Sequence, residues 1–204
     1  GPGRNDGRAR HPGGPYDRAS VGDPRYVPEF EKRWRRFSKV VGTSWRVDET
    51  YISIEAKWHY LHRAVDKPGK TVDVLPRRDR GIAAAQAFVR KALASTLPRV
   101  PRKVTLDGHV PSRRALWLLR REHPCWRNVE VRTNKYLNNV IEQDHRAIKR
   151  RCASMAGFKS FDNAAITIAG IELAHRIRKN QFSFKRGRRR RGWSRKAEWA
   201  MALA

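Results

Sequence analysis

The sequence predicts an α/β fold: a mixed five-stranded sheet flanked by helices, with a disordered or basic tail at each end. Two observations lead to this fold class. Strand-like runs rich in β-branched and aromatic residues come first, and later ones alternate with runs of helical period, in the order β-β-β-α-β-α-β-α-α. The chain has 204 residues, 39% of them hydrophobic, so it can bury the core of one main domain.

Residues 25–44 are expected to form a lead-in with a short helix. Phe30, Trp34 and Phe37 recur there at three- and four-residue spacing, which gives a helix starting near Pro28 an apolar stripe for packing on the core.

From Trp45 the residue pattern is that of strands. Three runs, WRVDETYISI, KWHYLHRAVDK and TVDVLP, are separated by turn-forming residues at Glu55-Ala56 and Pro68-Gly69. We expect a three-stranded meander at the start of a main domain that covers residues 45–184.

The second half of the chain alternates helices and strands and then ends in two helices. The expected elements are a helix at 81–95, a strand KVTLD, a helix at 112–122, a strand VEVRT, and helices at 139–154 and 161–179. The side chains expected to face the core from these helices are Ile82, Ala85, Phe88, Val89, Leu93, Leu116, Trp117, Leu119, Ala164, Ile168, Ile171 and Ala174.

The chain is very basic, with a net charge of +27 and a pI near 11.4. Such a surface attracts polyanions, because it neutralises phosphates and releases their counterions. Residues 1–24 carry +1 and residues 185–204 carry +7, which leaves +19 on the expected folded part. Nucleic acid is therefore the expected partner, and a basic tail alone does not explain the charge.

Both ends have the composition of unfolded segments. Residues 1–24 contain six Gly and four Pro with almost no apolar residue, so we expect disorder. Residues 185–204 include KRGRRRRGWSRK, in which eight of twelve residues are basic. Such a run either grips phosphates without reading bases or is simply solvated. The DNA-binding candidates in it are Arg188, Arg189, Arg190 and Arg191.

Neither a membrane span nor a secretory signal can be read from the chain, which has no apolar run of about 18 residues. Cys125 and Cys152 lack C-x-x-C spacing, so we expect reduced thiols with packing roles. We expect a cytoplasmic, nucleoid-associated protein with no membrane partner.

Three acids stand at element ends or in strand-like runs, where an unpaired buried carboxylate is costly. Asp48 lies in WRVDETY, Asp107 ends KVTLD, and Glu142 opens the helical run NNVIEQDHRAIKRR, with 34 residues between the last two. This order and spacing resemble the Asp-Asp-Glu triad of the transposase and retroviral-integrase superfamily. The strings WRVDETYI, KWHYLHRAVDK, KYLNNVIEQDHRAIK and GFKSFDNAAITIAGIELAHRIRKNQF resemble the catalytic domain of a bacterial insertion-sequence DDE transposase, over residues 25–184.

The resemblance implies a ribonuclease-H-like fold in which Asp48, Asp107 and Glu142 are catalytic and hold two Mg²⁺ or Mn²⁺ ions. Three carboxylates suffice, because Mg²⁺ keeps several waters and takes few protein ligands. Two ions about 3.5–4 Å apart serve phosphodiester cleavage and transfer. The resemblance also implies DNA partners, namely element ends and target, and assembly as a homodimer or larger synaptic oligomer.

Each acid also has an explanation without a metal. Asp48 can be a surface aspartate of a strand, although its apolar neighbours indicate a central strand covered on both faces. Asp107 before a glycine can begin a turn. Glu142 can interact with the helix dipole or pair with Arg146. The competing acids that lie off the family pattern are Glu49, Glu55, Asp66, Asp73 and Asp144.

A cationic stripe follows Glu142 along its helix. His145, Arg146 and Lys149 stand three, four and seven residues after it, so they share its face. DDE integrases often carry a basic residue seven positions past the glutamate, so the resemblance implies that Lys149 binds a phosphate near the scissile bond. For His145 we expect a hydrogen bond to an acid or phosphate and no metal ligation. A solvated helix face is the alternative.

Transposases of this type usually carry an N-terminal helix-turn-helix that binds the element ends. Here a Gly/Pro/Arg-rich stretch precedes the catalytic region, so we expect a copy without that segment. The expected function is metal-dependent DNA cleavage and strand transfer during transposition. The alternatives are a catalytically inactive or truncated basic nucleic-acid-binding protein derived from a transposase, and a ribonuclease-H-like nuclease or resolvase that cuts without joining.

Overall fold

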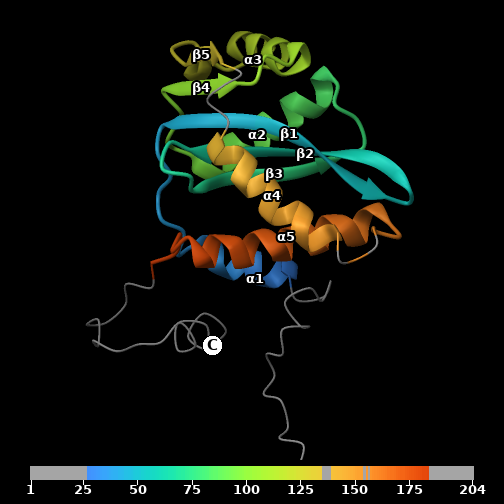
Figure 1. Ribbon diagram of the computed structural model, residues 1–204. Helices are drawn as coiled ribbons and strands as arrows, with labels where there is room; N and C mark the ends of the chain where they lie inside the picture. The colour runs from blue at the N-terminus through green and yellow to red at the C-terminus, as the bar shows by residue number, and fades with distance from the viewer. Residues whose placement is uncertain (1–26, 135–138, 154, 156, 184–204) are drawn as a thin grey trace, which may run out of the picture.

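A computed structural model of the chain describes residues 27–134, 139–153, 155 and 157–183. Its centre is a mixed five-stranded sheet with the order β3-β2-β1-β4-β5, in which β1 is the middle strand (Figure 1). The strands are β1 Ser44–Ile54, β2 Lys57–Asp66, β3 Thr71–Arg77, β4 Lys103–Leu106 and β5 Glu130–Thr133. The first three pair antiparallel, whereas β4 is parallel to β1 and to β5. The predicted meander and the α/β fold class are confirmed.

Helices cover both faces of this sheet (Figure 1). They are α1 Val27–Arg35, α2 Ile82–Thr96, α3 Val110–Glu122, α4 Asn139–Ala153 and α5 Phe161–Arg178. Residues along β1 alternate between the two faces because a strand has a side-chain period of two. Trp45 and Val47 therefore join the core under α2 and α3, and Ile52 and Ile54 join the core under α4 and α5.

The lead-in helix α1 packs against α5, as the apolar stripe predicts. Trp34 is buried and meets the ring of Phe182 edge to face, with 4.9 Å between ring centroids. Phe30 and Phe37 pack around this pair. The start of the described chain is thereby attached to its last helix.

The turn between β1 and β2 has an unfavourable backbone conformation for its residues. Ile54 pairs with Lys57, so the loop consists of Glu55 and Ala56. Their φ angles are 54° and 57°, in the left-handed region that a type I′ hairpin requires. Neither residue is the glycine or asparagine that this turn favours.

A buried ion cluster attaches α4 and α5 to the sheet. Arg63 of β2 is fully buried, and its Nη1 lies 3.2 Å from Asp144 Oδ2 of α4 and 3.2 Å from Glu172 Oε2 of α5. Lys179, just after α5, donates to Asp144 Oδ2 at 2.5 Å. Asp144 is thus a structural partner of cations, and it fixes the face that α4 turns to the sheet.

Two residues expected in the core lie at the surface. Ile82 is 39% exposed at the start of α2, and Trp117 is 43% exposed on α3. Leu116 and Leu119 take the inward face of α3, so the helical rotation between neighbours turns Trp117 outward. Its ring lies on the surface under the guanidinium groups of Arg114 and Arg121, at 4.2 and 4.9 Å from the ring centroid.

Both cysteines are free thiols. Cys152 packs against the core under α4 and α5, as predicted, whereas Cys125 is exposed, so the prediction of a packing role is wrong for it. Cys125 lies in a short 3-10 turn at Pro124–Trp126, where the neighbouring Trp126 takes the buried position. No helix in the described part of the chain combines the length and the apolarity that crossing a membrane requires.

Candidate active site

Strand register brings Asp48 and Asp107 together. Val47 and Leu106 form the last pair between the parallel strands β1 and β4. The residue after Val47 is Asp48, and the residue after Leu106 is Asp107. Both follow residues that point into the core under α2 and α3, so both point to the opposite face, where α4 lies. Asp48 is in the middle strand and Asp107 is at the carboxyl end of its neighbour.

Backbone amides and burial define the state of this acid pair. Asp48 Oδ1 accepts a hydrogen bond from the N–H of Glu49 at 2.9 Å, and Asp107 Oδ1 accepts one from the N–H of His109 at 3.0 Å. Burial raises the pKa of the Asp48 carboxyl to about 7, with smaller contributions from the neighbouring carboxylates of Asp107 and Glu49. Near neutral pH the Asp48 carboxyl is therefore only partly ionised.

No Lys or Arg among the described residues forms an ion pair with Asp48 or Asp107. The buried Asp144, by contrast, pairs with both Arg63 and Lys179. The chain has 46 Lys and Arg residues against 19 Asp and Glu. Asp48 and Asp107 are therefore two neighbouring carboxylates without a Lys or Arg partner in the part of the chain that the structure describes.

Glu142 lies on the first turn of α4, and its side chain is exposed. No described contact joins it to Asp48 or Asp107, and the described residues contain no group of three or more His, Cys, Asp or Glu side chains placed to hold a metal ion. The structure thus brings two of the three predicted acids together and leaves the third on the surface of the helix that covers them.

The residues after Glu142 divide between the interior and the surface. His145 is buried, with its Nδ1 3.7 Å from Asp48 Oδ2, a distance too long for a hydrogen bond. Burial, together with Arg63 and Lys149, lowers the pKa of His145 to about 3, so the imidazole is neutral. Arg146 and Lys149 are exposed. The predicted DNA-binding residues Arg188, Arg189, Arg190 and Arg191 lie outside the described residues.

Comparison with known proteins decides the family. A family model described as a DDE domain, of the IS240 transposase type, matches residues 42–181. The chain is also 35% identical over 167 residues to the transposase for insertion sequence-like element IS431mec of Staphylococcus aureus strain Mu50, a match that covers 78% of this chain and 69% of that protein.

The chain belongs to the DDE transposase family.

Solved structures show weaker likenesses to this DDE transposase. The catalytic core domain of BIV integrase is 15% identical with a TM-score of 0.45, over 79% of this chain and 96% of that one. The HTLV-2 integrase catalytic core domain in complex with magnesium is 14% identical with a TM-score of 0.44, over 65% of this chain and 85% of that one. The family assignment rests on the sequence matches.

The acid pair of this DDE transposase fits a divalent cation by its donor set. Carboxylate oxygens are the ligands that Mg²⁺ and Mn²⁺ prefer. Asp48 and Asp107 lie in mutual contact with no Lys or Arg partner among the described residues, and a nearby cation would offset the burial and the neighbouring carboxylates that raise the pKa of Asp48. Glu142, on the same helix as His145, is the acid that could complete the set from the α4 side.

Glu49, which lies off the family pattern, supports the pair from the other face of β1. Its Oε1 accepts a hydrogen bond from Ser112 Oγ at 2.6 Å, and its Oε2 lies 3.3 Å from His109 Nδ1. Burial disfavours ionisation of Glu49, but the contacts from His62 and Ser112 outweigh it and lower the pKa of the carboxyl. Because the N–H of His109 holds Asp107, this cluster fixes the loop after β4. The strand period of two, which puts neighbours on opposite faces, was the signal for it.

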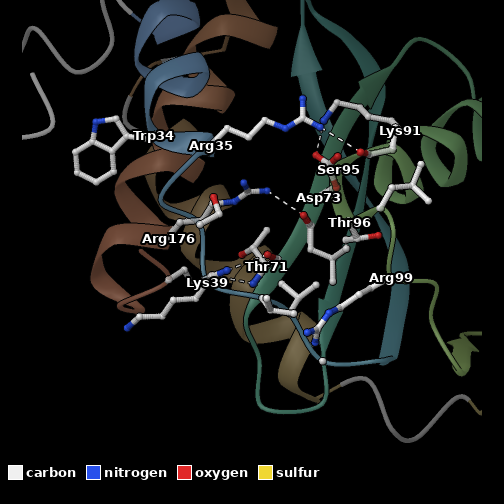
Figure 2. Close-up of a pocket in the computed structure, with 18 of the residues that line it drawn as sticks. Trp34, Arg35, Lys39, Thr71, Asp73, Lys91, Ser95, Thr96, Arg99 and Arg176 are labelled. Atoms are coloured by element: carbon white, nitrogen blue, oxygen red, sulfur yellow. Dashed lines mark hydrogen bonds and ion pairs between the residues drawn. The ribbon is translucent and has the colours of Figure 1, made fainter. Parts of the chain in front are cut away.

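A basic hollow of about 680 Å³ lies away from the acids, beside residues 41–43 and 99–101, which precede β1 and β4 (Figure 2). Its cations bond to backbone carbonyls: Arg35 to Ala94 at 3.2 Å and Arg176 to Val72 at 3.1 Å. Lys91 pairs with Asp73 in the same hollow. These contacts join α1, α2, α5 and β3, so we assign the hollow a structural role.

Proposed function

We propose that this chain is the catalytic domain of an insertion-sequence transposase that cuts DNA strands and joins them to target DNA. The catalytic residues are Asp48, Asp107 and Glu142, which hold two Mg²⁺ or Mn²⁺ ions. The observation that supports this most directly is the contact between Asp48 and Asp107 without a Lys or Arg partner among the described residues, in a chain with a net charge of +27. Family membership supplies the reaction class.

Ions bound by these acids would help to deprotonate the attacking oxygen and neutralise charge on the phosphoryl group. In cleavage, a water oxygen bonds to phosphorus while the bond from phosphorus to the 3′-oxygen breaks, which leaves a 3′-hydroxyl. In joining, that hydroxyl bonds to a target phosphorus while the target's own 3′-oxygen leaves. Joining conserves the number of phosphodiester bonds, so it requires no nucleotide hydrolysis, and the sequence has no Walker-type loop.

The residues around the acids orient the pair and the substrate. Backbone amides of Glu49 and His109 fix one oxygen of each aspartate. The neutral His145 fills the space between Asp48 and α4 without bringing a positive charge that would compete for the acids. Lys149 and Arg146 supply exposed cations on the same helix, suited to DNA phosphates.

In this proposal the side chain of Glu142 turns toward the two aspartates while the backbone of α4 stays in place. The residue is exposed on the first turn of α4, while the inward residues Ile141, Asp144 and His145 fix the helix. A glutamate has enough rotatable bonds to change direction without moving the helix. Binding of the ions and DNA supplies the free energy for that change.

The partners proposed are DNA element ends and target DNA, with a homodimer or larger synaptic oligomer as the active assembly and the nucleoid as its place in the cell. The charge of +19 on residues 25–184 supports DNA binding by the folded part.

The proposal is tested with purified protein, a duplex carrying the cognate element ends, a target plasmid, and Mg²⁺ or Mn²⁺. We expect cleaved 3′ ends and joined products, both lost with EDTA. Glu142→Gln should reduce both to background while DNA affinity stays the same or rises slightly, because the change removes a metal ligand and one negative charge. Glu31→Gln, an exposed glutamate on α1, is the matched control and should keep full activity.

Loss of DNA binding in parallel with activity in Glu142→Gln would instead indicate a structural role for this residue. The alternative function is a basic DNA-binding protein without chemistry, which the exposed position of Glu142 favours. Wild-type binding with no metal-dependent cleavage at cognate ends would establish that alternative. Cutting without any joined product would indicate a nuclease.

A further inference from the structure

A second hollow, of about 720 Å³, lies further along β1 from Asp48. The pairing of β1 with β4 stops at Val47, so β1 continues alone on that side until Phe158 bridges Ile54. The hollow crosses this open edge of β1: α4 borders it on the face of Asp48, and Tyr51 and Trp58 border it from the face that α2 covers. Its lining includes Tyr51, Ile52, Trp58, Lys149 and Cys152.

The two elements that line the hollow, β1 and α4, also meet at the contact between Asp48 and His145. Tyr51 is three residues beyond Asp48 on β1, which is about 10 Å along a strand. Lys149 is four residues beyond His145 on α4, which is about 6 Å along a helix. A stacked DNA strand covers about 10 Å in about three nucleotides. A DNA strand with one phosphate at the acids therefore reaches this hollow within a few nucleotides.

The wall from the hairpin is aromatic and held in place. The ring of Trp58 meets Tyr51 edge to face at 6.3 Å, and Tyr51 lies 5.2 Å from Tyr60. The hydroxyl of Tyr51 accepts a hydrogen bond from Arg80 Nη1 at 2.9 Å. Trp58 is nevertheless 68% exposed and Tyr51 45% exposed. Their free surfaces form a rigid stacking platform that contributes little to the core.

The opposite wall supplies charge. Lys149 is exposed, and no described residue forms an ion pair with it, although it lines the same hollow as the two rings. Aromatic rings that stack on bases, combined with cations that follow the phosphates, are the features of sites for single-stranded nucleic acid. An apolar peptide would use the rings but would leave the lysine unpaired.

We propose that this hollow binds an unpaired nucleobase of the DNA strand whose phosphodiester lies at the acid pair, with the base stacked on Trp58 and Tyr51 and its phosphate on Lys149. The inference rests on the proposed function, because it takes DNA as the substrate. It goes further by assigning a single-stranded segment near the scissile bond, which requires local unpairing of the end.

The test measures affinity in EDTA, where no cleavage occurs. The probes are a duplex with a short single-stranded 3′ end and a blunt duplex of the same sequence. Binding of each probe is measured by fluorescence anisotropy. Trp58→Ala should weaken binding of the single-stranded end by at least about fivefold and leave the blunt duplex unchanged, because stacking is lost. Trp58→Phe should keep most of the affinity. Lys149→Ala should reduce the salt slope for the same probe by about one.

Trp117→Ala is the matched control, since this exposed tryptophan lies on α3 away from the hollow. It should not change the preference for the single-stranded end. A probe with 2-aminopurine at the unpaired position should be quenched by the wild type and not by Trp58→Ala. The inference fails if Trp58→Ala weakens both probes equally or neither, or if an abasic nucleotide at that position binds as tightly as a base.

These outcomes separate the inference from the proposed function. A wild type that cleaves and joins DNA, together with a Trp58→Ala variant of unchanged preference, would overturn only the inference. A wild type that never cleaves but shows the Trp58-dependent preference would overturn only the proposed chemistry.

Discussion

Asp48 carries a charge in this fold only at a cost, because burial and neighbouring carboxylates raise its pKa to about 7. Its position follows from two simple rules. Parallel pairing places residues after Val47 and Leu106 side by side, and strand alternation points both to the α4 face. A divalent cation at the pair would stabilise the ionised form and with it the folded protein.

Metal binding should therefore raise the thermal stability of the wild type. Each kcal/mol by which metal binding stabilises the folded state shifts the Tm of a domain of this size by about 2–4 °C. Asp48→Asn should lose most of the shift that Mg²⁺ or Mn²⁺ produces, as measured by differential scanning fluorimetry with and without the metal. Glu31→Gln should respond as the wild type does. An equal shift in Asp48→Asn would place the metal at another site.

Single residues also mark the limit of the sequence prediction. The side-by-side placement of Asp48 and Asp107 was implied by the family resemblance, whereas strand period alone gives only the face of the sheet to which each aspartate points. The exposed side chain of Glu142 could not be predicted, because side-chain direction depends on rotamers and on what else occupies the site. The prediction that Trp117 faces the core was wrong for a related reason. Its hydrophobicity favours the core, but its neighbours Leu116 and Leu119 already fill the inward face.

At the scale of elements, the β1–β2 hairpin has a turn that its residues do not favour. Ala56 has a φ of 57°, where a Cβ is strained and a glycine is not. We expect Ala56→Gly to increase the free energy of unfolding by about 1 kcal/mol, measured by urea denaturation. The same substitution at Ala83, exposed on α2, should lower it by about 1 kcal/mol. Equal signs at both positions would contradict the strained turn.

The ion cluster under α4 and α5 should be costly to break. Arg63→Met leaves Asp144 and Glu172 buried without their shared cation, so we expect a loss of about 3–5 kcal/mol in urea denaturation. Arg90→Met is the control, because its pair with Glu122 at 2.6 Å is exposed and contributes less than about 1 kcal/mol. Similar losses in both variants would show that Arg63 contributes only as a surface residue does.

Element types were predictable from the sequence because patterns of period two and 3.6 are local. The order of strands and helices agrees with the sequence throughout the described chain, with boundaries shifted by a few residues, as for α3, which begins at Val110. The Arg63 cluster could not be predicted, because it joins residues 81 and 109 positions apart in the chain. Local pattern contains no information about which buried charges meet.

At the scale of the whole molecule, the charge of +27 is shared between the folded part and the ends of the chain. Composition alone predicted nucleic acid as the partner, because charge does not depend on the fold. It did not predict which surface binds, and the Arg-rich run falls outside the described residues.

Deleting residues 185–196 should therefore weaken DNA binding without abolishing it. The run has eight basic residues, so its loss should flatten the dependence of log affinity on log salt and weaken unrelated duplexes alike. The measurement compares two duplex sequences between about 50 and 200 mM salt. A Gly/Ser segment of equal length is the control for chain length. An unchanged slope, or a loss confined to one sequence, would show that the run does more than hold phosphates.

The shortness of β4 has a consequence for which insertions and deletions the family can accept. From Lys103 to Asp107 each residue reverses the direction of the side chain. With the start of β4 held in register, losing one residue there would turn the second aspartate toward α2 and α3. Losing two would restore the direction but move the acid by about 6.6 Å, out of reach of Asp48. We therefore expect length changes in this part of the DDE domain to fall in the loops that flank β4.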